Sequence, residues 1–267
     1  MTVAIDSTRQ SWQPPAVPLP PPAGEVIGVS TVAELFAAVD SAQPGTTIEI
    51  LDGCYVMPTV LTIRTDDVTL RSASGDRDAV VLDGSRSEHN ELLAFTECHR
   101  VTVADLTIRN VIQNGFKLNA NIGRGVQAIT LHNCVAHNVW QRGVKGVDGP
   151  EAGVPGDLPL RPGKAGRPPQ ARHFVDDCVI RYCLFHNDRP KRIDDEPYEQ
   201  KNPQIFDGNY IAAIDAMSAR NWRVHDNVFL GIRGRNGGAR GAIFFWQGSQ
   251  NVHIADNTIV DCDSGMW

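Results

Sequence analysis

The chain has 267 residues, of which 42% are hydrophobic, and its formal net charge at pH 7 is −6. This negative charge disfavours wholesale binding to nucleic acid or to an anionic membrane, so we expect neither partner. No apolar run approaches the roughly 20 residues of a membrane span. The 24 glycines and 17 prolines are typical of a fold with many turns, and the composition favours one elongated domain with a long, narrow core.

Residues 1–24 are rich in proline, with Pro20, Pro21 and Pro22 in succession. This composition predicts a disordered or polyproline arm. The segment lacks the apolar stretch of a secretory signal. The sequence as it stands therefore predicts an intracellular product, whereas a misplaced start codon would leave a secreted or periplasmic one, so the localisation stays open.

A short helix is predicted at about residues 30–42. Ser30 or Thr31 can act as its N-cap, Glu34 lies in its first turn, and apolar side chains recur along one face. We expect this helix to cap the open end of the core. The motif PGTTIEILDGCY follows at residues 44–55. Short β-rich runs come next, at residues 61–63, 68–70 and 80–84.

A recurring unit of about ten residues dominates the second half of the chain. It begins at Val101, Ile129, Cys178, Trp222 and Val252. In each unit apolar and polar residues alternate around a polar bend, as in half-buried strands. Asn227 and Asn257 share the bend position, which predicts a short amide ladder. A repeat of this kind is typical of a solenoid, and the sequence therefore predicts an all-β parallel β-helix.

The spacing of the units predicts two insertions. One coil takes 28 to 30 residues, since the first two units start 28 residues apart and the last two 30, but the starts at Ile129, Cys178 and Trp222 lie 49 and 44 residues apart. Two coils therefore carry insertions of roughly 15 to 20 residues, as loops on one face of a solenoid do. We place them at about residues 148–172 and 188–207.

The β-helix domain is predicted over residues 25–267. After Asp261 the chain ends within a unit, at an edge that carries Met266 and Trp267. A solenoid needs a polar terminal cap, and an open apolar edge is a pairing hazard. We therefore expect the chain to be a fragment or a truncated reading frame.

The capping helix, the motif at residues 44–55 and the short strands after it resemble the start of the pectate-lyase-like β-helix proteins, most closely the alginate-lyase and chondroitinase-B branch. The resemblance implies a single-stranded right-handed parallel β-helix from residue 30 onward. It also implies elimination chemistry with a lysine and an arginine, and calcium as neutraliser in some members. We match no metal-ligand pattern of that branch onto this chain, so no metal ligand is predicted and calcium as cofactor is left open. β-Helices also serve hydrolases, epimerases and adhesins, so the fold alone transfers no active site.

Candidate functional residues lie on the strand that follows each bend. We stack the segments that begin at Gly115, Gly143, Ile211 and Gly241 and assign their faces by alternation. The predicted outward residues of this groove are Lys117, Asn119, Lys145, Asp215 and Phe245, with Arg142 and Arg240 just before two of the strands. Phe244 and Trp246 are predicted to face the core.

This set of side chains suits β-elimination on an acidic polysaccharide, which is the predicted partner. We expect the chain to be a monomer. The reaction removes the proton α to a uronate carboxylate, so the site must neutralise that carboxylate and supply a base and an acid. We predict Lys145 as base with Lys117 in support, because a nearby like charge lowers a lysine pKa. Arg240 or Arg142 is predicted as carboxylate clamp or acid. The predicted substrate-binding residues are Asn119, Asp215 and Phe245.

Two other classes stay open. A glycoside hydrolase needs two carboxylates about 5 to 9.5 Å apart, and the predicted groove holds only Asp215. A noncatalytic carbohydrate-binding or structural protein needs only the solenoid, whose exposed lysines are commonly solvated. His137 and His186 share a repeat position and are interpreted as a surface pair without a third ligand. Cys134 and Cys183 also share one, which predicts a buried stack, whereas a disulfide needs an oxidising compartment.

Overall fold

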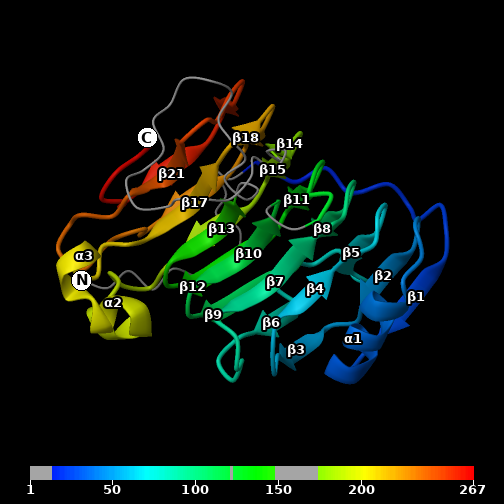
Figure 1. Ribbon diagram of the computed structural model, residues 1–267. Coiled ribbons are helices and arrows are strands. Elements are labelled where there is room, and N and C mark those ends of the chain that lie inside the picture. Colours follow the sequence, from blue (N-terminus) through cyan, green and yellow to red (C-terminus); the bar gives the residue numbers. More distant parts are fainter. Residues whose placement is uncertain (1–13, 121–122, 148–173) are drawn as a thin grey trace.

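The computed structural model of the chain describes residues 14–120, 123–147 and 174–267. Within these ranges the backbone winds through three parallel sheets, named A, B and C here, and returns to sheet A after each coil (Figure 1). Neighbouring coils pair in register in all three sheets. This architecture confirms the predicted right-handed parallel β-helix.

The strands of each sheet follow one another in the order of the coils. Sheet A contains β1 (Val26–Val29), β2 (Thr47–Ile50), β5 (Thr69–Ser72), β8 (Thr102–Ala104), β11 (Thr130–His132), β15 (Val179–Arg181), β19 (Arg223–His225) and β22 (His253–Ala255). Sheet B contains β3 (Gly53–Val56), β6 (Val80–Asp83), β9 (Thr107–Val111), β12 (Val135–Val139), β16 (Leu184–His186), β20 (Val228–Leu230) and β23 (Thr258–Val260). Sheet C contains β4 (Leu61–Ile63), β7 (Glu91–Thr96), β10 (Asn114–Asn119), β13 (Arg142–Val147), β17 (Ala212–Met217) and β21 (Gly241–Trp246). Outside these sheets lie the strand pair β14 (Val175–Asp176) and β18 (Ala219–Arg220), the helices α1 (Val32–Ser41), α2 (Pro197–Lys201) and α3 (Pro203–Phe206), and the 3-10 turn η1 (Ile193–Asp195).

The corner between sheets A and B explains the polar bend of the repeat. The backbone has positive φ at Asp105, Asn133, Tyr182, Asp226 and Asp256. Asn and Asp tolerate this left-handed region better than most residues, which accounts for their place in the motif. The next side chain turns into the corner, where Nδ2 of Asn227 donates to Oδ1 of Asn257 at 2.9 Å. The predicted amide ladder is therefore confirmed.

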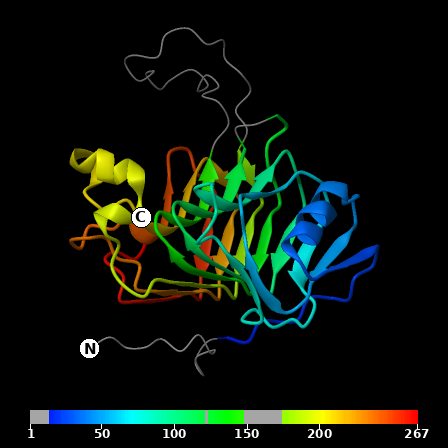
Figure 2. The same ribbon diagram turned by 90° about the horizontal axis from the view of Figure 1, so that it is seen from below.

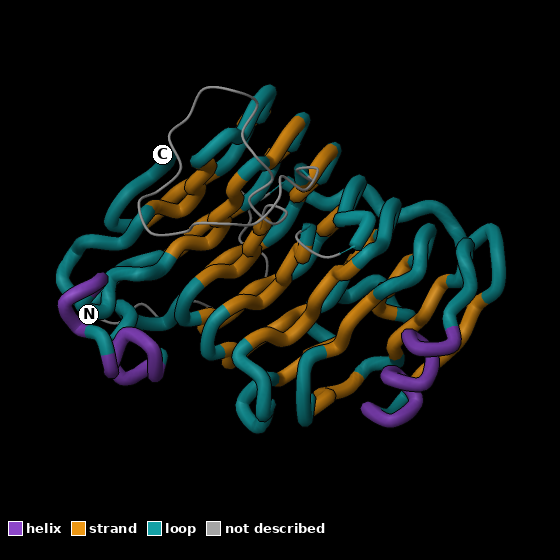
Figure 3. Tube along the Cα trace, viewed as in Figure 1, coloured by secondary structure: helices purple, strands orange, loops and turns teal. Residues whose placement is uncertain are grey.

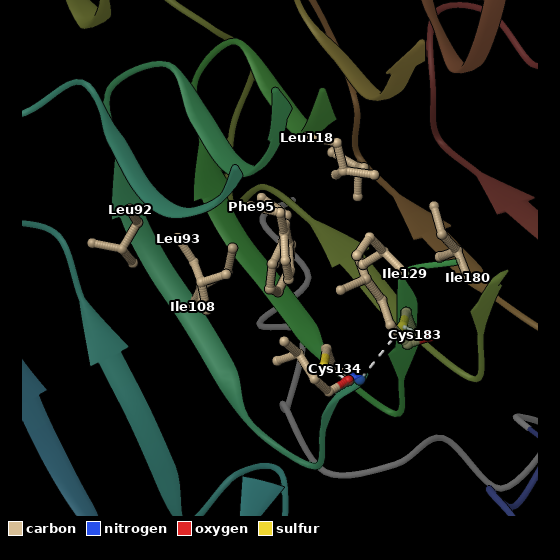
Figure 4. Packing of buried hydrophobic residues seen from close by; sticks show 14 of the residues in the cluster. Leu92, Leu93, Phe95, Ile108, Leu118, Ile129, Cys134, Ile180 and Cys183 are labelled. Carbon is tan, nitrogen blue, oxygen red and sulfur yellow. Dashed lines mark hydrogen bonds between the residues drawn. The ribbon is translucent and has the colours of Figure 1, made fainter. Parts of the chain in front are cut away.

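The core is a column of apolar side chains stacked from coil to coil. Phe185 and Phe229 lie parallel with ring centroids 5.1 Å apart. Cys134 and Cys183 are buried among leucine, isoleucine and phenylalanine side chains, and the backbone N–H of Cys134 donates to Sγ of Cys183 at 3.4 Å (Figure 4). All six cysteines are free thiols. The pair is thus the predicted buried stack and forms no disulfide.

The predicted capping helix is present as α1. Its N-cap is Thr31, and a capping box joins Thr31 to Glu34 through hydrogen bonds of 3.2 and 3.1 Å. Leu35 and Val39 are buried, and the helix packs against β1, β2 and β4. The helix covers the first coil at one end of the solenoid, where it is drawn in blue in Figure 2. None of the described helices is long and apolar enough to cross a membrane.

The described part of the proline-rich arm lies against sheet A. Nε2 of His132 is 2.9 Å from the carbonyl oxygen of Val17, and the Arg71 guanidinium donates to the carbonyl of Pro20 at 3.3 Å. These contacts place the arm on strands from two coils. Residues 1–13 lie outside the described residues.

The second predicted insertion, at residues 188–207, is folded. It contains η1, α2 and α3, which Figure 3 shows as helical segments beside the sheets. Nζ of Lys191 lies 3.0 Å from Oε1 of Glu199 and donates to the carbonyl of Tyr210 at 3.1 Å, and both charged side chains are fully buried. The ion pair joins two parts of the insertion, and the hydrogen bond to Tyr210 ties the insertion to the segment that enters sheet C. The first predicted insertion, at residues 148–172, lies outside the described residues.

Candidate active site

Sheet C aligns charged groups from successive coils in one row. Lys117 of β10 pairs in register with Lys145 of β13, and Lys145 pairs with Asp215 of β17. The row continues at Phe244 of β21. The sequence prediction that Lys117 and Lys145 stand one coil apart on the same face is therefore confirmed.

Asp215 is the centre of a cluster of three cations. Its Oδ1 accepts a hydrogen bond from Nζ of Lys145 at 2.7 Å, and its Oδ2 accepts one from Nε of Arg142 at 3.0 Å. Nη1 of Arg240 lies 3.7 Å from Oδ2 of Asp215. The Asp215 side chain is fully buried, and those of Lys145 and Arg142 are only 7% exposed. We call these four residues the Asp215 cluster. With Lys145 protonated, three positive groups and one negative group leave a net charge of +2.

Aromatic rings hold the two arginines of the cluster in place. The guanidinium carbon of Arg142 lies 3.9 Å from the ring centroid of Tyr210. That of Arg240 lies 4.2 Å from the ring of Phe244 and 4.9 Å from the ring of Trp246. Nε1 of Trp246 also donates to the central carboxylate at 3.2 Å. Cation–π stacking fixes the planes of both guanidinium groups beside this carboxylate.

The surroundings of the cluster lower the pKa of both Lys145 and Asp215. Burial, the largest cause, lowers the pKa of Lys145 to about 8, the charges of Arg142 and Arg240 act in the same direction, and Asp215 opposes them. Burial raises the pKa of Asp215, but the surrounding cations outweigh burial and hold it below its usual value. Asp215 is therefore ionised at neutral pH, while Lys145 can lose and regain a proton there. A group with such a shifted pKa marks a candidate catalytic site.

The two predicted site residues of β10, Lys117 and Asn119, contact residues of β7 and not the Asp215 cluster. Nζ of Lys117 is 2.6 Å from Oε1 of Glu91 on β7. Nδ2 of Asn119 donates to Oγ1 of Thr96 at 3.2 Å. Because Glu91 neutralises Lys117, the lowered pKa of Lys145 is explained by burial and by the two arginines and does not require Lys117.

The face predicted for the aromatic residues of β21 is wrong. Phe245 packs against the core, with its ring centroid 5.4 Å from that of Trp222. Phe244 and Trp246 lie on the groove side, in contact with the Asp215 cluster. The alignment of segments predicted from the sequence paired Asp215 with Phe245, whereas the structure pairs Asp215 with Phe244. A slip of one residue exchanges the two faces of a strand.

The Asp215 cluster does not suit calcium. Ca²⁺ takes six to eight oxygen ligands, but both oxygens of Asp215 face nitrogen atoms of cations. The carboxylate of Glu91, which lies beside Lys117 of this row, is paired with the Lys117 ammonium. The groups around Asp215 are therefore cations, which repel a metal ion.

A second polar cluster lies on sheet B. His137 of β12 and His186 of β16 are stacked, with ring centroids 4.0 Å apart and planes at 12°. The prediction of a surface pair is wrong for His186, which is 2% exposed; burial, the main cause, lowers its pKa to about 3. Nε2 of His137 lies 2.9 Å from Oδ1 of Asp188. Asp188 is thus the third polar partner that the sequence did not reveal.

The similarity of this chain to known proteins is a similarity of fold. No protein-family model matches the sequence, and no curated protein matches it. Among solved structures, an alginate lyase from Paenibacillus sp. str. FPU-7 is similar with a TM-score of 0.51 and 13% identity, over 89% of this chain and 76% of that one. A PL6 family polysaccharide lyase from Pseudopedobacter saltans gives a TM-score of 0.44 and 14% identity, over 90% of this chain and 54% of that one. The chain therefore shares the parallel β-helix fold of the Paenibacillus alginate lyase.

Proposed function

We propose that this chain is a polysaccharide lyase that cleaves a uronate-containing polymer by β-elimination, with Lys145 as the base. The observation that supports this most is the Asp215 cluster, in which a lysine with a lowered pKa stands between two arginines. The net positive charge favours an anionic sugar. The similar Paenibacillus protein is an alginate lyase, which makes acidic polysaccharides the first substrates to test.

The two arginines supply the carboxylate clamp. Arginine stays charged at all working pH values, and its planar fork matches a carboxylate. Arg240 is the more exposed of the two, at 18%, and is the arginine that reaches the substrate. Arg142 is held by Asp215 and Tyr210 and adds positive charge behind it. Together they stabilise the negative charge that builds up as the α-proton leaves.

Lys145 carries the proton in this mechanism. Its neutral amine takes the proton α to the uronate carboxylate, the released electron pair forms the carbon–carbon double bond, and the glycosidic carbon–oxygen bond breaks. The departing oxygen then needs a proton. The Lys145 ammonium is the strongest acid among the cations of the cluster, because the arginines keep their protons. We therefore assign both proton transfers to Lys145 and the clamp to Arg240 and Arg142.

A glycoside hydrolase is not favoured by the same geometry. Its general acid is a carboxylic acid kept protonated by a raised pKa. Here the cations around Asp215 lower its pKa. The carboxylate of Glu91 lies against the ammonium of Lys117, so neither group is in the environment that the hydrolase mechanism needs.

The reaction class can be tested with a panel of alginate, pectate, chondroitin sulfate, dermatan sulfate and a neutral glucan. We expect ultraviolet absorbance from an unsaturated uronate to rise on at least one acidic polymer and not on the glucan. New reducing ends without this absorbance would indicate hydrolysis. No product at all from a chain shown by circular dichroism to be folded would favour a binding or structural role.

The pH dependence of the elimination gives a separate test of the base. We expect kcat/KM to rise about tenfold per pH unit on the acid side and to level off near pH 8, because only neutral Lys145 accepts the proton and its pKa is about 8. The profile is measured at constant ionic strength on the substrate found above. An acid limb near pH 4 would point instead to a carboxylate base.

A further inference from the structure

We infer that His137, His186 and Asp188 form a binding site for one divalent transition-metal ion, and that zinc is the ion this ligand set suits. The three residues each offer a ligand atom, and these atoms all lie within 4.8 Å of one another. They come from adjacent coils on sheet B, whereas the Asp215 cluster lies on sheet C. The inference is therefore independent of the proposed lyase activity.

The burial of His186 is the observation that points to a ligand. The residue is 2% exposed, yet neither Nδ1 nor Nε2 has a hydrogen-bond partner. Buried polar side chains normally find one, because leaving them unpaired costs free energy. Coordination of a metal ion by one ring nitrogen satisfies that nitrogen.

Asp188 is already held as a metal-binding carboxylate is. Nδ2 of Asn138 donates to its Oδ2 at 2.8 Å, and the backbone N–H of Asp188 donates to Oδ1 of Asn138 at 3.0 Å. Its other oxygen, Oδ1, lies 2.9 Å from Nε2 of His137. Hydrogen bonds of this kind orient the ligands of metal sites. Asn138 thus positions Asp188 without occupying the oxygen that faces the histidines.

Only small side-chain movements separate this arrangement from a coordinated one. Tetrahedral zinc, with bonds of about 2.0 to 2.1 Å, places its ligand atoms about 3.3 Å apart. The stacked rings must turn about their Cβ–Cγ bonds so that their nitrogens converge. His186 has no hydrogen bond to lose in such a turn, and the bond of His137 is made to Asp188, which is itself a ligand.

The ligand types select the ion. Two imidazoles and one carboxylate suit zinc and its transition-metal neighbours, whereas calcium prefers a shell of oxygen atoms. Three protein ligands leave a fourth position for water, and the 58% exposure of the Asp188 side chain places that position at the surface. Bound zinc would join two coils at the point where the insertion at residues 188–207 begins.

Zinc titration of the chelator-treated chain by calorimetry tests the site, with cobalt as a spectroscopic probe of tetrahedral coordination. We expect one strong zinc site per chain and no competition from calcium. His137→Gln and Asp188→Asn change partly exposed side chains and should fold, and each is expected to weaken zinc binding by more than about 100-fold. His186→Leu should do the same, because it removes both ring nitrogens, and leucine is the residue found at the paired position Leu230 of the next coil.

The matched control is His253→Gln, because His253 is exposed on β22 of sheet A and belongs to no such group among the residues that the structure describes. It should bind zinc as the unchanged chain does. The inference is overturned if the unchanged chain shows no saturable zinc binding. It is also overturned if His137→Gln and Asp188→Asn, shown to be folded, bind zinc with unchanged affinity.

Discussion

Lys145→Met is expected to lower the kcat of uronate elimination by about 10²- to 10⁴-fold, the usual worth of a positioned base. Methionine keeps most of the length and apolar stem of the side chain and removes the amine. KM should change little, because Arg240 still contacts the substrate carboxylate and Arg142 still adds positive charge behind it. Initial rates of ultraviolet absorbance on the identified polymer, fitted for kcat and KM separately, provide the measurement.

Two other lysines provide controls for this result. Lys201 is exposed on α2 and is not a member of the Asp215 cluster, and Lys201→Met should leave kcat unchanged. Lys117→Met tests the supporting role predicted from the sequence. We expect the acid limb of the pH profile to stay near 8, because burial and the two arginines, and not Lys117, lower the pKa of Lys145. Wild-type kcat in a folded Lys145→Met variant would show that Lys145 is not the base.

The fold could be predicted because the same local rule recurs in every coil. Apolar alternation sets the strands, and a residue with positive φ sets each bend, which is Asp or Asn in four of the five repeat units and Tyr182 in the other. The stacking of Lys117 on Lys145 followed from the same repeat. The predicted alignment placed Asp215 opposite Val147, two residues from its observed partner Lys145, and a slip of two residues kept Asp215 on the predicted face. The rule failed at β21 because residues 242–246 are apolar throughout, so alternation there gives no indication of which side chains face the core.

The surroundings of the predicted site could not be derived in this way. Tyr210 and Asp188 belong to segments between the repeats, where no periodicity assigns a face. Trp246 reaches Asp215 only because the coils stack. The lowered pKa of Lys145 also depends on burial by these neighbours. Local sequence shows which residues share a strand face, but the extent of their burial depends on side chains that come from elsewhere in the chain.

Asp215→Asn is expected to lower the free energy of unfolding by about 3 to 5 kcal/mol, because it leaves three buried or partly buried cations without their counter-charge. Urea denaturation at pH 7 measures this. The cations lower the pKa of Asp215 below 3.8 in the folded state. Its stabilising contribution is therefore present above the unfolded pKa and is lost as the pH falls through the lower folded value. The difference between variant and wild type should shrink below about pH 3.8.

The double variant Asp215→Asn/Lys145→Met measures how much the ion pair between these two side chains contributes to stability. If the two side chains interact as their 2.7 Å contact indicates, the double variant should lose less stability than the two single variants together. Asp215→Asn also removes the charge that raises the pKa of Lys145. The acid limb of its kcat/KM profile should then move below pH 8, a shift that a loss of stability alone does not produce. Additive stability losses with an unmoved limb would contradict the coupling of Asp215 to the base.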